Sequence, residues 1–198
     1  MKKPLWIWII SLALAAFWGW TGPALAETPT VYVRGILDQV MGLQNDPAQS
    51  PQARSQAIHR IIERNFDFAL MAKDSLGPSY ERLSGGQRQE FTQTFSYLFQ
   101  DSYARLVLNF LKKENIQYGR ELPEGDKARV DTAIVRTNEN IPVTYLMHTA
   151  PQGWILYDVT VDGVSILQIY KAKFAETIRT NSFDFLLKRM QEQRQAIQ

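Results

Sequence analysis

The hydrophobic period of this sequence changes twice, and the two changes fix the order of its helices and strands. Before Asn115 the apolar residues recur at intervals of three and four, which is typical of amphipathic helices. From Ile116 to Asp162 they follow a period of two, as in strands, and the helical spacing returns after Gly163. The expected order along the chain is therefore helices, then strands, then helices.

Breaker residues set the expected limits of the helices. Clusters such as Asn45-Asp46-Pro47 and Leu76-Gly77-Pro78 end periodic segments, and the longest segment carries a continuous apolar stripe from Phe91 to Phe110. The helices we expect are 33–45, 53–65, a short helix through 71 that closes at 76–78, 86–113, 164–180 and 183–193.

Four strands are expected between the two groups of helices. They are 116–122, 128–137, 141–149 and 154–162, separated by short segments rich in Pro, Gly and Asn. Short connections favour antiparallel neighbours, so we expect one mainly antiparallel, four-stranded sheet.

The first 26 residues have the organisation of a cleaved secretory signal peptide. Lys2 and Lys3 precede an apolar run, and Ala24-Leu25-Ala26 is a small-x-small cleavage pattern. The alternative is an uncleaved membrane anchor, for which the run is short. We expect residues 27–198 to form a single domain that is exported to a periplasm, and the absence of cysteine excludes lipoprotein anchoring.

The mature chain carries no electrostatic signature of a nucleic-acid-binding protein. Without Lys2 and Lys3, the remaining 20 basic residues balance the 20 acidic ones. Neither a basic run for nucleic acid nor a polybasic patch for anionic membranes is present. An exported chain without cysteine must be stabilised by its core, and this one is long enough to bury one.

Leu83 to Gln87 spells LSGGQ, the signature with which nucleotide-binding domains of ABC transporters contact ATP on a partner subunit. Binding of the phosphates also requires a glycine-rich loop that ends in Lys-Ser or Lys-Thr, and no such loop occurs in this sequence. A capping box explains the residues better, because Ser84 is followed three positions later by Gln87. The motif therefore indicates a helix start and gives no support to an ATPase.

No other residue pattern predicts catalysis, a metal site or a cofactor. His59 lies within an expected amphipathic helix and His148 at a strand end, and two histidines without cysteine do not favour zinc. Asp158 and Asp162 share a strand face by their even spacing and could pair as acid and base. We expect instead that Asp162 caps the following helix and that Asp158 accepts local hydrogen bonds. Ser165 has no GxSxG setting and is expected to cap the same helix.

Large apolar residues occur on both faces of the middle strands, as in Tyr145-Leu146-Met147 and Ile155-Leu156-Tyr157. A sheet that is apolar on both faces must be covered on both. Covering helices could fill the space completely, or one layer could stand off and leave an apolar cavity for a ligand. Periodicity alone leaves both alternatives open.

Short motifs over most of the mature chain match one known family in order and spacing. They are Phe66-Asp67-Phe68 with Met71-Ala72 and Leu76-Gly77; Gln87-Arg88 with Phe91 and Phe95; Tyr103; and, most specific in combination, Gly153-Trp154, Tyr157-Asp158-Val159, Asp162-Gly163-Val164-Ser165, Tyr170, Phe174 and Ile178. With these motifs the chain resembles the toluene-tolerance auxiliary family, the MlaC-type phospholipid-binding components of an ABC lipid-transport system. Tyr80 and the glycines after Ser84 depart from the family pattern, away from the expected cavity.

The resemblance implies an α+β fold in which the twisted, mainly antiparallel sheet and its surrounding helices form a cone around an apolar cavity. It also implies a periplasmic carrier without enzymatic activity that shields the acyl chains of a phospholipid. Its partners would be an outer-membrane lipoprotein–porin complex and an inner-membrane ABC transporter, between which it shuttles lipid. The residues expected to contact lipid are Phe95, Leu98, Leu106, Phe110, Val143, Tyr145, Met147, Leu156, Tyr170 and Phe174.

Two other classes of protein stay open at this point. Cone-shaped folds also host isomerases and dehydratases that use a buried carboxylate, which here would be Asp158 facing the cavity. The second alternative is a non-catalytic binding or scaffold protein with a filled core.

Overall fold

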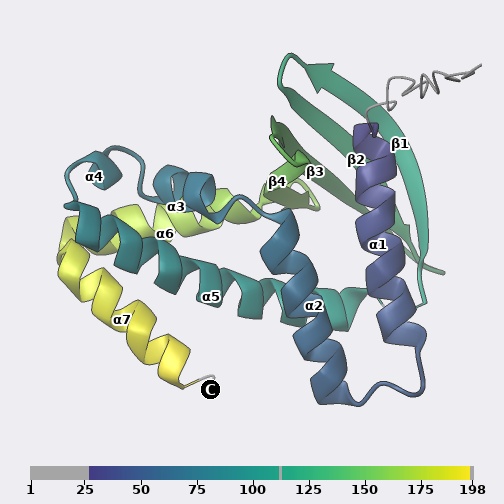
Figure 1. Cartoon of the computed structure of the whole chain (residues 1–198), viewed down its shortest axis with the longest axis horizontal. Helices are drawn as coiled ribbons and strands as arrows, with labels where there is room; N and C mark the ends of the chain where they lie inside the picture. Colours follow the sequence, from purple (N-terminus) through teal and green to yellow (C-terminus); the bar gives the residue numbers. More distant parts are fainter. Residues whose placement is uncertain (1–26, 112, 197–198) are drawn as a thin grey trace, which may run out of the picture.

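The computed structural model describes residues 27–111 and 113–196, so the expected signal peptide lies outside the described residues (Figure 1). Single-turn helix α4 follows directly after Gly77. It is too short for its apolar residues to show a helical period, so the sequence did not predict it. The other helices lie close to their expected limits. The helices are α1 (Pro29–Asn45), α2 (Pro51–Asn65), α3 (Phe68–Leu76), α4 (Pro78–Glu81), α5 (Gly85–Phe110), α6 (Ile166–Thr180) and α7 (Phe183–Gln195).

The strands form one antiparallel sheet in sequence order, and the α+β prediction is confirmed. The sheet has five strands and not four, because two residues after the Asp162-Gly163 turn pair back on the preceding strand. The strands are β1 (Asn115–Glu124), β2 (Lys127–Val135), β3 (Asn140–Ala150), β4 (Gly153–Val161) and β5 (Val164–Ser165).

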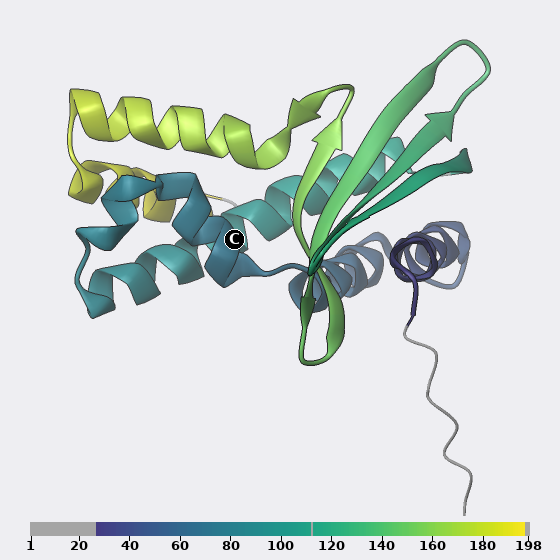
Figure 2. The same ribbon diagram turned by 90° about the horizontal axis from the view of Figure 1, so that it is seen from above.

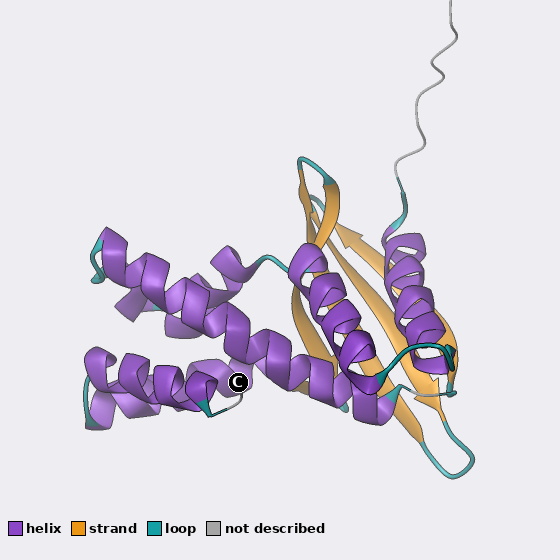
Figure 3. Ribbon diagram, turned by 60° about the horizontal axis from the view of Figure 1, so that its bottom comes forward, coloured by secondary structure: helices purple, strands orange, loops and turns teal. Residues whose placement is uncertain are grey.

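One face of the sheet is buried much more deeply than the other. Val130, Tyr145 and Val159 stand opposite one another on neighbouring strands, and all three are buried. On the other face Asp131 and Thr144 are only partly buried. The expectation of a sheet covered equally on both faces is therefore wrong for its middle strands. Helix α1 packs on β1 and β2, and Figure 3 shows α1 and α2 on the same side of the sheet.

Helices α3, α4, α6 and α7 lie beyond the β4 edge as a second layer, and α5 runs from this layer to the sheet, which is clearest from above (Figure 2). Their contact is aromatic: the Phe95 ring of α5 lies 5.4 Å from the Tyr170 ring and 6.2 Å from the Phe174 ring of α6, measured between centroids. Phe91 lies 5.7 Å from Phe174. Such edge-to-face contacts add stability beyond the burial of apolar area. None of the helices in the described ranges is both long and apolar enough to span a bilayer.

The LSGGQ segment forms the predicted capping box at the start of α5. The Gln87 backbone N–H donates to the Ser84 hydroxyl at 3.2 Å, and the Ser84 N–H donates to the Gln87 side-chain oxygen at 3.0 Å. These two bonds satisfy backbone donors that a helix start would otherwise leave unpaired. The segment is thereby accounted for as a helix cap.

Candidate functional site

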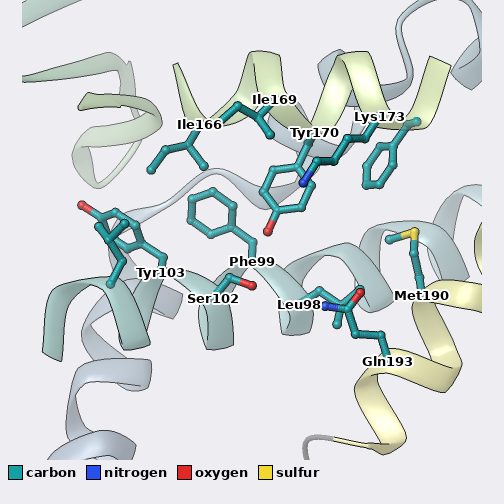
Figure 4. A pocket seen from close by; sticks show the side chains of 12 residues that line it. Leu98, Phe99, Ser102, Tyr103, Ile166, Ile169, Tyr170, Lys173, Met190 and Gln193 are labelled. Carbon is teal, nitrogen blue, oxygen red and sulfur yellow. The ribbon is translucent and has the colours of Figure 1, made fainter. Parts of the chain in front are cut away.

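An apolar cavity of about 400 Å³ lies where α5, α6 and α7 meet. Its size falls in the range of roughly 300–1,000 Å³ that is usual for small-molecule sites. Figure 4 shows side chains from the three helices pointing into this space. The lining residues are Leu98, Phe99, Ser102, Tyr103, Leu106, Ile166, Ile169, Tyr170, Lys173, Phe174, Met190 and Gln193.

The floor of this cavity is apolar and its rim is polar. Leu98, Phe99 and Phe174 are buried, whereas Lys173 and Gln193 are exposed. Burial raises the pKa of the Tyr170 phenol, although a hydrogen bond with Ser102 opposes the shift. The phenol is therefore neutral at physiological pH, so Tyr170 presents no negative charge to a ligand.

A second, smaller hollow of about 40 Å³ lies under the covered face of the sheet. It shares Tyr103 and Leu106 with the first cavity, so these two side chains of α5 stand between the hollows. The two hollows therefore adjoin each other along α5, one in the helical layer and one under the sheet. The second hollow is lined by Tyr103, Leu106, Val107, Phe110, Leu111, Ile134, Val143, Tyr145 and Val161.

The structure brings most of the predicted lipid-contact residues to these hollows. Around the first are Leu98, Leu106, Tyr170 and Phe174; around the second are Leu106 again, Phe110, Val143 and Tyr145.

Phe95, Met147 and Leu156 line neither hollow, in contrast to the expectation from sequence. All three are at most 1% exposed and belong to the packed core. Phe95 is surrounded by the rings of neighbouring aromatic residues, which leaves no free space beside it. Their side chains lie on the expected faces, but neighbouring atoms fill the space around them.

Sequence reasoning missed several lining residues. Lys173 lies three positions after Tyr170, a spacing that places both on one helix face and could have revealed it. Met190 and Gln193 belong to α7, and nothing in the sequence shows where α7 docks. The other missed residues are Phe99, Ser102, Tyr103, Ile166 and Ile169 around the first cavity and Val107, Leu111, Ile134 and Val161 around the second hollow.

Asp158 is a buried carboxylate whose oxygens are fully engaged at the start of α6. Its Oδ1 accepts hydrogen bonds from the backbone N–H of Val159 at 2.8 Å and of Leu167 at 3.0 Å, and its Oδ2 accepts from the Ser165 hydroxyl. Ser165 in turn accepts from the Gln168 N–H, which confirms it as a helix cap. Asp158 lines neither hollow, so it does not face the cavity as an enzyme of the proposed type would require.

The expectation for Asp162 needs correction. Its φ of 50° places it in the left-handed region within the turn between β4 and β5, which a short polar residue tolerates. Asp158, four residues earlier, supplies the carboxylate that caps α6. The short strand β5 separates Asp162 from the helix start.

Replacing Asp158 should reveal a structural role. We expect Asp158→Ala to lower the free energy of unfolding by about 3 kcal/mol, because it leaves two buried N–H donors unpaired. Asp158→Asn keeps one acceptor oxygen for the two backbone N–H groups and loses the acceptor for Ser165, so it should cost about 1 kcal/mol and leave lipid exchange intact. Urea denaturation measures both, and an alanine variant as stable as the wild type would contradict this role.

The same carboxylate should make stability depend on pH in the acid range. Burial raises the pKa of Asp158 above its ordinary value of 3.8, although its hydrogen-bond donors oppose the shift. Because the unfolded chain loses this proton at a lower pH, the Asp158 contribution to the free energy of unfolding falls as pH rises between the two pKa values. Above the folded-state pKa the contribution no longer changes with pH. Asp158→Asn should remove this dependence of the free energy of unfolding on pH.

The two histidines offer no metal site within the described ranges. His148 Nε2 lies 2.9 Å from Oδ2 of Asp67, whose Oδ1 caps α3 by accepting from the Leu70 N–H. This pair therefore ties β3 to the start of α3. No group of three or more His, Asp or Glu among the described residues could hold a metal ion.

Comparison with known proteins shows which family this chain belongs to. The family model described as MlaC protein matches residues 33–192. The chain is 24% identical over 202 residues to the intermembrane phospholipid transport system binding protein MlaC of Haemophilus influenzae, covering 97% of this chain and 93% of that protein. It is 24% identical over 165 residues to the toluene tolerance protein ttg2D of Pseudomonas putida, covering 80% and 77% respectively.

The fold also matches a solved structure. A phospholipid-binding protein from Ralstonia solanacearum, determined in complex with a phospholipid, superposes with a TM-score of 0.73 at 20% sequence identity. The match covers 86% of this chain and 98% of that one. The helices and the sheet of the two proteins are therefore arranged in the same way.

Proposed function

From its membership of the MlaC family and its apolar cavity, we propose that this chain is a phospholipid carrier. The acyl chains are held between α5, α6 and the sheet. The family model covers most of the described residues, and the relatives it matches are named as phospholipid transport and toluene tolerance proteins. The single observation that carries the proposal is the pair of adjoining apolar hollows along α5, the cavity at Leu98 and the hollow at Val143.

Physical chemistry explains why such an apolar space suits a lipid carrier. Two acyl chains with about 30 methylenes, at ~0.8 kcal/mol each, oppose free diffusion through water by about 24 kcal/mol. A carrier must therefore replace water around the chains with apolar side chains. The neutral balance of charges in the mature sequence suits a protein that must leave each membrane after contact.

The family and the sequence also support a cellular setting for this activity. The protein acts in the periplasm after removal of residues 1–26, and it moves lipid between an outer-membrane lipoprotein–porin complex and an inner-membrane ABC transporter. It performs no chemistry on the lipid. In support, the buried carboxylate Asp158 is saturated with hydrogen bonds and lies outside both hollows.

Lipid analysis of the purified protein tests this function. We expect protein isolated from a bacterial periplasm to contain phospholipid at up to one molecule per chain, because the cavity should not be exposed to water. Solvent extraction followed by mass spectrometry measures the content, with a periplasmic protein of similar size as the control. Phospholipid no higher than in the control, together with no uptake from vesicles, would overturn the proposal.

A further inference from the structure

We propose that Lys173, at the rim of the cavity, binds the phosphate of the lipid head group. This inference rests on the proposed function and extends it from the acyl chains to the polar end of the ligand. It starts from a third hollow, of about 470 Å³, between α6 and α7.

This third hollow continues the cavity toward solvent. The two share Lys173, Phe174, Met190 and Gln193, so the hollow directly adjoins the cavity. We call this hollow the vestibule. It is more polar than the cavity, because Thr177, Arg189 and Glu192 also line it.

Lys173 is the charged residue that both spaces share. It is exposed, and no acidic side chain in the described part of the protein forms an ion pair with it. Arg189, by contrast, lies 3.9 Å from Glu192. Figure 4 shows Lys173 and Tyr170 extending from α6 on one side of the cavity, with Ser102 of α5 and Gln193 of α7 on the other.

This arrangement matches the structure of a phospholipid, in which glycerol joins two apolar acyl chains to a phosphodiester anion. With the chains on the floor formed by Phe99 and Phe174, the phosphate reaches the rim. There the ammonium group of Lys173 can donate to it, with the phenol of Tyr170 on the same side of the cavity and the amide of Gln193 on the other. A charged donor to phosphate makes a stronger hydrogen bond than a neutral donor does.

The test compares a phospholipid with a diacylglycerol that has the same acyl chains and no phosphate, each offered to delipidated protein from neutral vesicles. Wild-type protein should bind the phospholipid more tightly, and Lys173→Gln should weaken phospholipid binding by about fivefold while leaving diacylglycerol binding unchanged. Lys173→Arg should keep the preference, and high salt should reduce it, because the pair is exposed.

Lys171→Gln is the matched control. Lys171 is exposed on the same helix but faces Gly77 at the end of α3, so its loss should not change the binding of either lipid. Inorganic phosphate should not displace phospholipid, because chain burial supplies most of the affinity. The assignment is overturned if Lys173→Gln affects both lipids equally or neither, or if inorganic phosphate displaces the lipid. Binding of neither lipid by wild-type protein would overturn the carrier function itself, and with it this assignment.

Discussion

Leu106→Trp should reduce phospholipid loading by about tenfold while the protein remains folded. Leu106 is only partly buried, and it lies where the cavity and the hollow under the sheet meet. A larger indole at this position fills the space that the acyl chains would occupy. Because free space is available, we expect the free energy of unfolding to change by no more than about 1 kcal/mol.

The matched control for this variant is Asn109→Trp, three residues further along α5. Asn109 is exposed and lines neither hollow, so an added indole there should leave loading unchanged. Bound phospholipid per chain and urea denaturation are measured on the same samples. If loading by Leu106→Trp equals that of the wild type, or falls only in proportion to unfolding, the pair of hollows along α5 is not the binding site.

Val143→Asp should instead unfold the protein. Val143 is 4% exposed on the covered face of the sheet, and the adjoining hollow of about 40 Å³ is too small to hydrate a carboxylate. An unpaired buried charge there should lower the free energy of unfolding by about 3 to 5 kcal/mol. Lipid loading should be lost together with the fold, and circular dichroism during urea denaturation follows the loss.

A control for charge alone is Ala133→Asp on β2. Ala133 lies on the open face of the sheet, on the same side as Asp131 and its ion pairs with Arg120 and Arg129. A carboxylate there stays in contact with water and should cost less than about 1 kcal/mol. A stable Val143→Asp variant would show that the space beneath the sheet is larger and wetter than the structure describes.

The long elements of the fold could be predicted from the sequence because each carries its own period. Helix α5 shows an apolar stripe from Phe91 to Phe110, and the four long strands alternate between clear breakers. The elements that were missed, α4 and β5, have four and two residues, too few for any period to appear. Leu146 and Ile155 are apolar but only partly buried. Apolar residues on both faces of a strand therefore do not show that helices cover both faces of the sheet to the same extent.

The cavity could be predicted only in part, because periodicity gives the direction of a side chain and not the space around it. Phe95 and Leu98 lie on the same stripe of α5, yet Phe95 is enclosed by other rings while Leu98 borders the cavity. The difference arises from how closely α6 and α7 approach α5, which is a property of tertiary packing. Residues of α7 such as Met190 therefore join the site without any signal in the sequence.

The most direct test of the account is a crystal structure of the protein loaded with a phospholipid that is brominated along its acyl chains. Anomalous scattering from bromine places the chains independently of the protein phases. We predict bromine peaks between α5 and α6, beside Tyr103 and Leu106 and on toward Val143. Peaks confined to the surface groove between α1 and α2, lined by Arg60 and Arg64, would contradict the account, as would a loaded protein whose cavity contains none.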